Sequence, residues 1–346
     1  MKRFTVRETN ICKGAACLLL LMHHLFFPQI RWDSYYHIFG MTPPLISYPA
    51  QAAKVCVAIF MILSGYGLTK SAQKSGDAGI KFVYRHLVKL LFGFWFVFVI
   101  FVPLGFVFGK PPTGVYGGGV KGMLRCFIDF MGIANVVHTP TANATWWFMG
   151  DIILLYIFFP LLVRIMKKIP YIALAVSAVL CFAYANTTLD KLAWIFPFIT
   201  GIFFAQKDLF EKIINHKKSG LIIAGAFLYC VILAIIRLRF ALSTRTDTFL
   251  GIGVIVFSAM ALSRIRYVNT ALGFIGKHSA NIFMMHTFIY SLYFSRQIYS
   301  LWYPILIYAA LLGSCLLISM GMEALKRLIR YNKLQSLLLN IGGNKS

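Results

Sequence analysis

Two ionisable side chains in the first long apolar stretch, Lys13 and His24, have a spacing that suits chemistry inside a membrane. They are eleven positions apart. This spacing is close to three helical turns, so a helix places both on one face, about 16 Å apart. At that separation they do not contact each other. The pattern predicts a cation near the membrane surface that holds an anionic group, and an imidazole three turns deeper beside a reactive atom.

The chemistry open to His24 is proton transfer. A neutral imidazole, with an unperturbed pKa of about 6.5, is a competent general base at physiological pH. The neighbouring His23 points about 100° away around the helix. The alternative for a histidine inside a membrane is a structural hydrogen bond to a neighbouring helix.

The elements that must position these residues are membrane-spanning helices. The 346-residue chain is 59% hydrophobic with a mean hydropathy of +0.76, whereas an ordinary soluble domain is roughly 45–50% apolar. Apolar stretches long enough to cross the hydrocarbon recur along the sequence, which excludes a soluble fold. We therefore expect an all-α, multi-pass protein of the cell (plasma or inner) membrane.

About ten stretches are expected to be spans. They lie near 11–28, 50–70, 84–108, 146–166, 170–186, 191–206, 218–238, 247–263, 275–294 and 303–325. The segment 110–145 contains Pro111-Pro112 and three consecutive glycines, so it is expected to be a long extracytoplasmic loop with a short interfacial helix. The whole chain, 1–346, is expected to be one integral membrane domain that ends in a basic cytoplasmic tail, 326–346.

Lysine and arginine are distributed unevenly between the loops that these spans define. With the N-terminus inside, 24 of the 34 basic residues fall in cytoplasmic segments, where cations accumulate. We therefore expect both termini to be cytoplasmic. The net charge of +24 is then mainly a topology signal, and no nucleic-acid partner is expected. A basic cytoplasmic face would also attract anionic membrane lipids and a polyanionic donor molecule.

Other polar residues at membrane depth are secondary candidates, because their burial is costly unless pairing or function requires it. Asp151 lies about one turn inside its span and is the only acid expected in the hydrocarbon core, where it needs a partner. Ser64 precedes Gly65 and either lines the site or marks a close helix contact. Trp147 belongs to an interfacial aromatic belt or to a sugar-stacking platform. His286 either faces the same cavity or makes a packing hydrogen bond.

Neither a metal nor a bound cofactor is expected. The seven cysteines are scattered without metal-ligand spacing, and no two histidines have convincing ligand spacing on one helix face. On the outer side, Arg237, Arg239 and Arg245 break the charge bias. They form either an outer lip for an anionic glycan or ordinary loop charge.

Five short motifs, in order along the chain, resemble the membrane-bound acyltransferase 3 family of integral membrane sugar O-acyltransferases. The first is Asn10-Ile11-Cys12-Lys13-Gly14, which ends ten residues later in His24 and resembles the family's first-helix signature. The others are Phe60–Tyr66 with its Ser-Gly-aromatic element, the basic segment Tyr84–Lys89, Trp146-Trp147-Phe148 with Tyr156 and Pro160, and Gly276-Lys277-His278-Ser279 with Ile282 and His286.

This resemblance implies that the protein is an enzyme that transfers an acyl group, most often acetyl, from cytoplasmic acyl-CoA to a hydroxyl of a cell-surface or exported saccharide. Acyl-CoA is then a donor substrate and not a bound cofactor. The resemblance assigns catalysis to His24 and donor binding to Lys13, Arg85 and Lys89, whose cations would hold the phosphates. The residues expected to line the site are Asn10, His23, Ser64, Trp147, Asp151 and His286.

The rival from another class is a transporter or flippase of a glycan or lipid-linked intermediate, which also needs a polar cavity among many helices. The sequence has neither an internal repeat nor a pair of matching broken helices, which are typical of many secondary transporters. A lipid-linked glycosyltransferase is disfavoured because the chain has ten acidic residues and only Asp151 is expected deep in a span.

Overall fold

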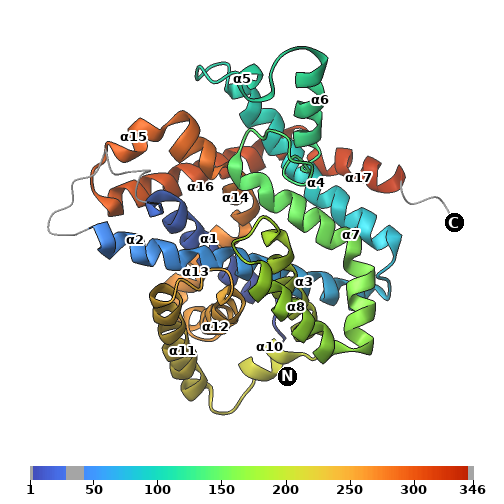
Figure 1. The fold of residues 1–346 in the computed structure, drawn as a ribbon, viewed down its shortest axis with the longest axis vertical. Coiled ribbons are helices and arrows are strands. Elements are labelled where there is room, and N and C mark those ends of the chain that lie inside the picture. Colours follow the sequence, from blue (N-terminus) through green and yellow to red (C-terminus); the bar gives the residue numbers. More distant parts are fainter. Residues whose placement is uncertain (1–2, 29–42, 342–346) are drawn as a thin grey trace. The chain divides into compact units, whose positions relative to one another are not determined.

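The computed structural model describes residues 3–28 and 43–341, and within them the chain is helical with turns and no strand (Figure 1). Seven stretches are long and apolar enough to cross a membrane, which confirms a multi-pass architecture. They are α1 (Val6–Phe26), Leu45–Ser75 with α2 (Pro43–Ala52) and α3 (Cys56–Ser75), α4 (Ile80–Leu104), Ala144–Lys168 with α7 (Trp147–Lys168), α11 (Ser219–Arg239), Asp247–Arg264 with α12 (Asp247–Met260), and α16 (Pro304–Leu328).

The expected count of about ten spans is not confirmed, because three predicted spans coincide with shorter helices. The stretch 170–186 forms α8 (Pro170–Tyr184), and 191–206 forms α9 (Ile195–Gln206) after a single 3₁₀ segment. The stretch 275–294 is divided at His278 between α13 (Arg266–Lys277) and α14 (Ser279–Thr287), and it continues as a π-helix, η7 (Phe288–Tyr293). A straight helix needs about 20 residues to span the hydrocarbon, so none of these pieces alone has that length.

The remaining helices are short or lie at the ends of the longer ones. They are α5 (Pro112–Tyr116), α6 (Gly119–Phe130), α10 (Leu209–Ile214), α15 (Ser295–Tyr299) and α17 (Tyr331–Ile341). The segment 110–145 thus contains a helix, α6, near the position where an interfacial helix is expected. The cytoplasmic placement of the termini stays a prediction, and Lys2, Arg31 and Lys345, which contribute to it, lie outside the described residues.

The chain forms two compact units, each built from two separate segments. The first unit contains Met1–Gly76 and Leu161–Ser279, and the second contains Asp77–Pro160 and Ala280–Ser346.

In the first unit, α1 and α13 touch through their backbones. A Cβ atom added to Gly14 would lie 2.1 Å from the backbone oxygen of Leu272, and one added to Gly276 would lie 1.9 Å from that of Asn10. No side chain fits at either distance. Small residues allow such close approach, which favours packing between helices in a membrane. The Asn10–Gly14 motif and the Gly276 motif, far apart in sequence, are therefore one contact.

A second glycine pair joins α3 to α9 in the same unit. A Cβ on Gly65 would lie 2.2 Å from the backbone oxygen of Phe198, and one on Gly201 would lie 2.1 Å from that of Ile62. The Ser64-Gly65 pair therefore marks a close helix contact through its glycine, which is one of the two alternatives drawn from the sequence.

The second unit is held together by aromatic packing. The ring of Trp146 lies 4.8 Å from Phe94 and 5.5 Å from Phe98, both on α4, and 5.5 Å from Phe288 of η7. Its indole N–H donates to the backbone oxygen of Met284 on α14, at 2.9 Å. These contacts bring α4, α14 and the start of α7 together.

Candidate functional site

The start of α1 is fixed by a capping box. The backbone N–H of Arg7 donates to the Thr5 hydroxyl at 3.2 Å, and the carboxylate of buried Glu8 accepts from the Thr5 backbone N–H at 3.0 Å. This arrangement satisfies donors that a helix otherwise leaves open. From there α1 runs without a proline to Phe26, so the register that places Lys13 and His24 on one face is continuous.

Lys13 lies two turns inside α1, because the helix begins five residues before the predicted start of the span. Its side chain is partly buried. It stands beside the backbone contacts that Asn10 and Gly14 make with α13. The predicted cation is thus placed next to a close backbone contact between α1 and α13.

The two histidines lie in the last turn of α1 and contact each other. The Nδ1 atom of His23 is 2.9 Å from the backbone oxygen of Ala50 on α2. A carbonyl oxygen only accepts, so Nδ1 of His23 carries the proton. The His23 ring lies edge-on to His24 at 5.0 Å and stacks with Phe27 at 5.6 Å. His23 therefore makes the structural hydrogen bond that was one alternative for it, and its ring packs against His24.

The first unit holds five of the predicted residues, namely Asn10, Lys13, His23, His24 and Ser64. All five are partly buried. Asn10, Lys13, His23 and His24 are carried by α1, and Ser64 is carried by α3 beside the Gly65 contact. Their roles in binding and catalysis stay predictions.

In the second unit, Arg85 and Lys89 are exposed and four residues apart on α4, so they share one helix face. Between them, His86 is turned onto its own helix. Its Nδ1 lies 2.8 Å from the backbone oxygen of Phe82, and the two rings are 4.0 Å apart. The pair of cations is therefore presented at the surface of this unit.

The other predicted residues of the second unit are more deeply placed. His286 is fully buried, with Nδ1 2.9 Å from the backbone oxygen of Phe283 in its own helix, which fits a packing hydrogen bond. Asp151 is 4% exposed on α7. Trp147 is partly buried and packs edge-on against Phe148 at 6.1 Å.

Comparison with known proteins identifies the family. A family model described as an acyltransferase domain matches residues 7–323. The chain belongs to the acyltransferase 3 family. The match begins in the first turn of α1 and ends in α16, so it includes segments of both units. No curated protein and no solved structure matches the chain. The protein is thus a membrane acyltransferase.

One feature of this acyltransferase was misjudged from the sequence. The sequence leaves Arg237 as part of an outer lip or as ordinary loop charge, and its 1% exposure excludes both for this residue. Its Nε donates to Asp247 at 2.7 Å, and Nη1 and Nη2 donate to the backbone oxygen of Gln51 at 2.8 Å and to the Ser243 hydroxyl at 3.2 Å. Asp247 is itself 1% exposed, so Asp151 is not the only buried acid near a span.

The sequence did contain a signal for this ion pair. Arg237 ends one apolar stretch and Asp247 begins the next, ten residues later. Two consecutive spans joined by a short turn form a hairpin, so charges at the two inner ends meet. The guanidinium uses all three nitrogens, and it ties α2, α11 and α12 together at one point.

The described part of the chain contains neither a disulfide nor an arrangement suited to a metal ion. All seven cysteines are free thiols, and five of them are buried. Within residues 3–28 and 43–341, no cluster of three or more histidine, cysteine or acidic side chains is arranged to hold a metal ion.

Proposed function

We propose that this acyltransferase moves an acyl group, acetyl in the commonest case, from acyl-CoA to a hydroxyl of a cell-surface or exported saccharide. The observation that carries the proposal is the pair Lys13 and His24 on one continuous face of α1, in a chain that belongs to the acyltransferase 3 family.

His24 is proposed as the general base. Its imidazole takes the proton of the acceptor hydroxyl while that oxygen attacks the thioester carbonyl carbon, and the carbon–sulfur bond then breaks. The imidazolium returns the proton to the departing thiolate, so the products are the ester and free CoA. Such positioned proton transfer contributes roughly 10²–10⁴-fold to a rate.

The contact between the two histidines supports this assignment. His23 is anchored to the backbone oxygen of Ala50, and its ring packs against His24. A general base must be held in one orientation toward the proton that it removes. We therefore assign His23 as a positioning residue that restrains the imidazole of His24.

Lys13 is proposed to hold a phosphate of the donor. It is about 16 Å along the helix axis from His24, a separation that an extended pantetheine arm can bridge between the phosphates and the thioester. An ammonium group binds phosphate as a point charge. Arg85 and Lys89 remain predicted donor ligands on the basis of the family resemblance.

The test is acetyl transfer by the purified protein reconstituted with labelled acetyl-CoA and a panel of glycans. His24→Ala is expected to lower transfer at least 100-fold, whereas His138→Ala, a matched change at an exposed histidine of the second unit, leaves it unchanged. Transfer that is undiminished in His24→Ala refutes the base assignment. Absence of CoA-dependent transfer to every glycan refutes the proposed substrates.

A further inference from the structure

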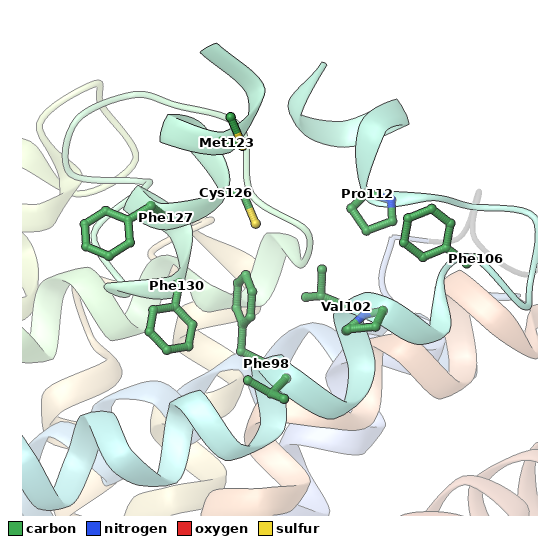
Figure 2. A pocket seen from close by; sticks show the side chains of 10 residues that line it. Phe98, Val102, Phe106, Pro112, Met123, Cys126, Phe127 and Phe130 are labelled. Carbon is green, nitrogen blue, oxygen red and sulfur yellow. The ribbon is translucent and has the colours of Figure 1, made fainter. Parts of the chain in front are cut away.

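The second unit contains an open apolar groove between the end of α4 and helix α6 (Figure 2). Its volume is about 440 Å³, within the range of small-molecule sites. The groove is lined by Phe98, Val99, Val102, Pro103, Phe106, Pro112, Met123, Cys126, Phe127 and Phe130. Every one of these side chains is apolar or a thiol, so the groove suits a hydrocarbon ligand.

The spacing of residues in α6 creates one wall. Met123, Phe127 and Phe130 are separated by four and three residues, so they share one face of the helix. Figure 2 shows Phe130 and Cys126 of α6 near Phe98 of α4, with Phe127 farther from it. The ring of Phe130 also stacks on Trp95 of α4 at 5.2 Å, which fixes the closed end of the wall.

The other side of α6 is anchored by a buried hydrogen-bond pair. The Tyr116 hydroxyl donates to the Asp129 carboxylate at 2.7 Å, and the Ala142 backbone N–H donates to the same oxygen at 2.8 Å. Arg125 donates to the backbone oxygen of Tyr116 at 3.1 Å. These bonds fix α6 against the segment of Tyr116 and against Ala142, independently of its contacts with α4.

Several groove residues are strongly exposed. Phe106, Met123 and Phe127 are 65%, 66% and 59% exposed, which is unfavourable in water. The groove lies at one end of the span Ile80–Leu104, the depth at which the hydrocarbon of a bilayer meets the headgroups. Lipid chains are therefore the apolar molecules that reach it at the highest concentration.

The charge around the groove is positive. On the polar side of α6, Lys121 is exposed and Arg125 is partly exposed. Lys110 is also exposed, and it directly precedes the two prolines that include Pro112 of the groove lining. The acid of this helix, Asp129, is 1% exposed and engaged by Tyr116. An exposed cationic surface above an apolar groove complements an anionic headgroup with its acyl chain.

We propose that the groove between α4 and α6 binds one acyl chain of an anionic membrane phospholipid, with Lys110 and Lys121 beside its phosphate. This proposal does not depend on the acyl-transfer reaction, because the binding is measured directly.

The first experiment uses nanodiscs of phosphatidylcholine that contain a small fraction of phosphatidylglycerol with a diazirine in its acyl chain. After illumination, peptide mapping is expected to find adducts on residues 98–130. Cys126→Trp fills the groove and is expected to reduce them roughly tenfold, because each lost methylene contact weakens affinity about fourfold. Leu124→Trp is the matched control, since Leu124 is exposed on the same helix but does not line the groove.

The second measurement needs no variant and reports on the native groove. Cys126 and Cys230 are the two partly buried cysteines, and the other five are buried. Alkylation of Cys126 by N-ethylmaleimide is expected to slow at least threefold when phosphatidylglycerol is added to delipidated protein. The reactivity of Cys230, on α11 of the first unit, provides the internal reference.

Three results would overturn the proposal. One is equal photolabelling of wild type and Cys126→Trp, together with alkylation of Cys126 in the wild type that phosphatidylglycerol does not slow. Another is a phosphatidylcholine probe that labels the groove as strongly as the phosphatidylglycerol probe does, together with undiminished phosphatidylglycerol labelling of the Lys110→Gln/Lys121→Gln variant. The site would then not distinguish an anionic headgroup from a zwitterionic one. The last is protection by an isoprenoid phosphate or by a second copy of the chain, and not by phosphatidylglycerol.

Discussion

Removal of the Arg237 side chain should destabilise the acyltransferase strongly. Arg237→Met leaves the carboxylate of Asp247, which is 1% exposed, without its 2.7 Å ion pair. The backbone oxygen of Gln51 and the hydroxyl of Ser243 also lose a donor. Breaking a buried ion pair by removing one partner costs about 3–5 kcal/mol. Because 1 kcal/mol shifts the Tm of a chain of this size by roughly 2–3 °C, we expect a fall of about 6–15 °C.

The cysteines supply the assay for this prediction. Five of the seven thiols are buried, so a thiol-reactive dye becomes fluorescent as the protein unfolds on heating in detergent. The double variant Arg237→Met/Asp247→Leu is expected to recover most of the loss, because an apolar replacement of a whole buried pair is often neutral. A single variant that unfolds within 2 °C of wild type, or a double variant as unstable as the single one, would refute this account of the pair.

Three further predictions concern other contacts. Gly276→Ala should lower the free energy of unfolding by about 1–3 kcal/mol and also reduce transfer activity, because the new Cβ would lie 1.9 Å from a backbone oxygen of α1. Thermal unfolding and initial rates measure these two effects. Gly273→Ala, where a Cβ meets open space, is the control. Arg85→Gln and Lys89→Gln should each raise the KM for acyl-CoA about tenfold with a smaller change in kcat, whereas Lys81→Gln should not. Burial raises the pKa of the Asp129 carboxyl, so its contribution to stability is full below the unfolded pKa of about 3.9 and is lost as pH rises through the folded pKa. The opening free energy of 112–142, obtained from hydrogen exchange after correction for the base-catalysed intrinsic rate, should therefore fall with rising pH, and in Asp129→Asn this fall should disappear.

Local sequence patterns predicted much of α1. The apolar run predicts a helix, and the spacing of Lys13 and His24 places them on one face in the structure as well. The capping box of Thr5 and Glu8, which starts the helix earlier than expected, is a local pattern of the same kind. These features depend on residues within a few turns of each other, so they can be derived without knowledge of the fold.

The contacts that position α1 could not be predicted in the same way. The contact between Gly14 and Leu272 joins residues on separate helices that are far apart in sequence. In the sequence, Gly14 and its counterpart Gly276 on α13 each resemble any other small residue in a helix. Helix length does not follow from hydropathy either, because the apolar stretch of α9 is as hydrophobic as a span but contains only 12 helical residues. Hydropathy measures affinity for an apolar environment, and both lipid and protein interior provide one.

The split of the first unit into Met1–Gly76 and Leu161–Ser279 has a consequence for biosynthesis. Helix α1 is made about 240 residues before α13, the partner that its glycine and asparagine backbone contacts require. At roughly 5–20 residues per second, α1 waits about 10–50 s for α13. The histidines gain their partners early, because Ala50 on α2 follows soon after α1 in synthesis. The segment Asn10–Gly14, which includes Lys13, instead stays without the backbone contacts of α13 throughout that interval, so the membrane insertion machinery or lipid must cover it until the chain is nearly complete.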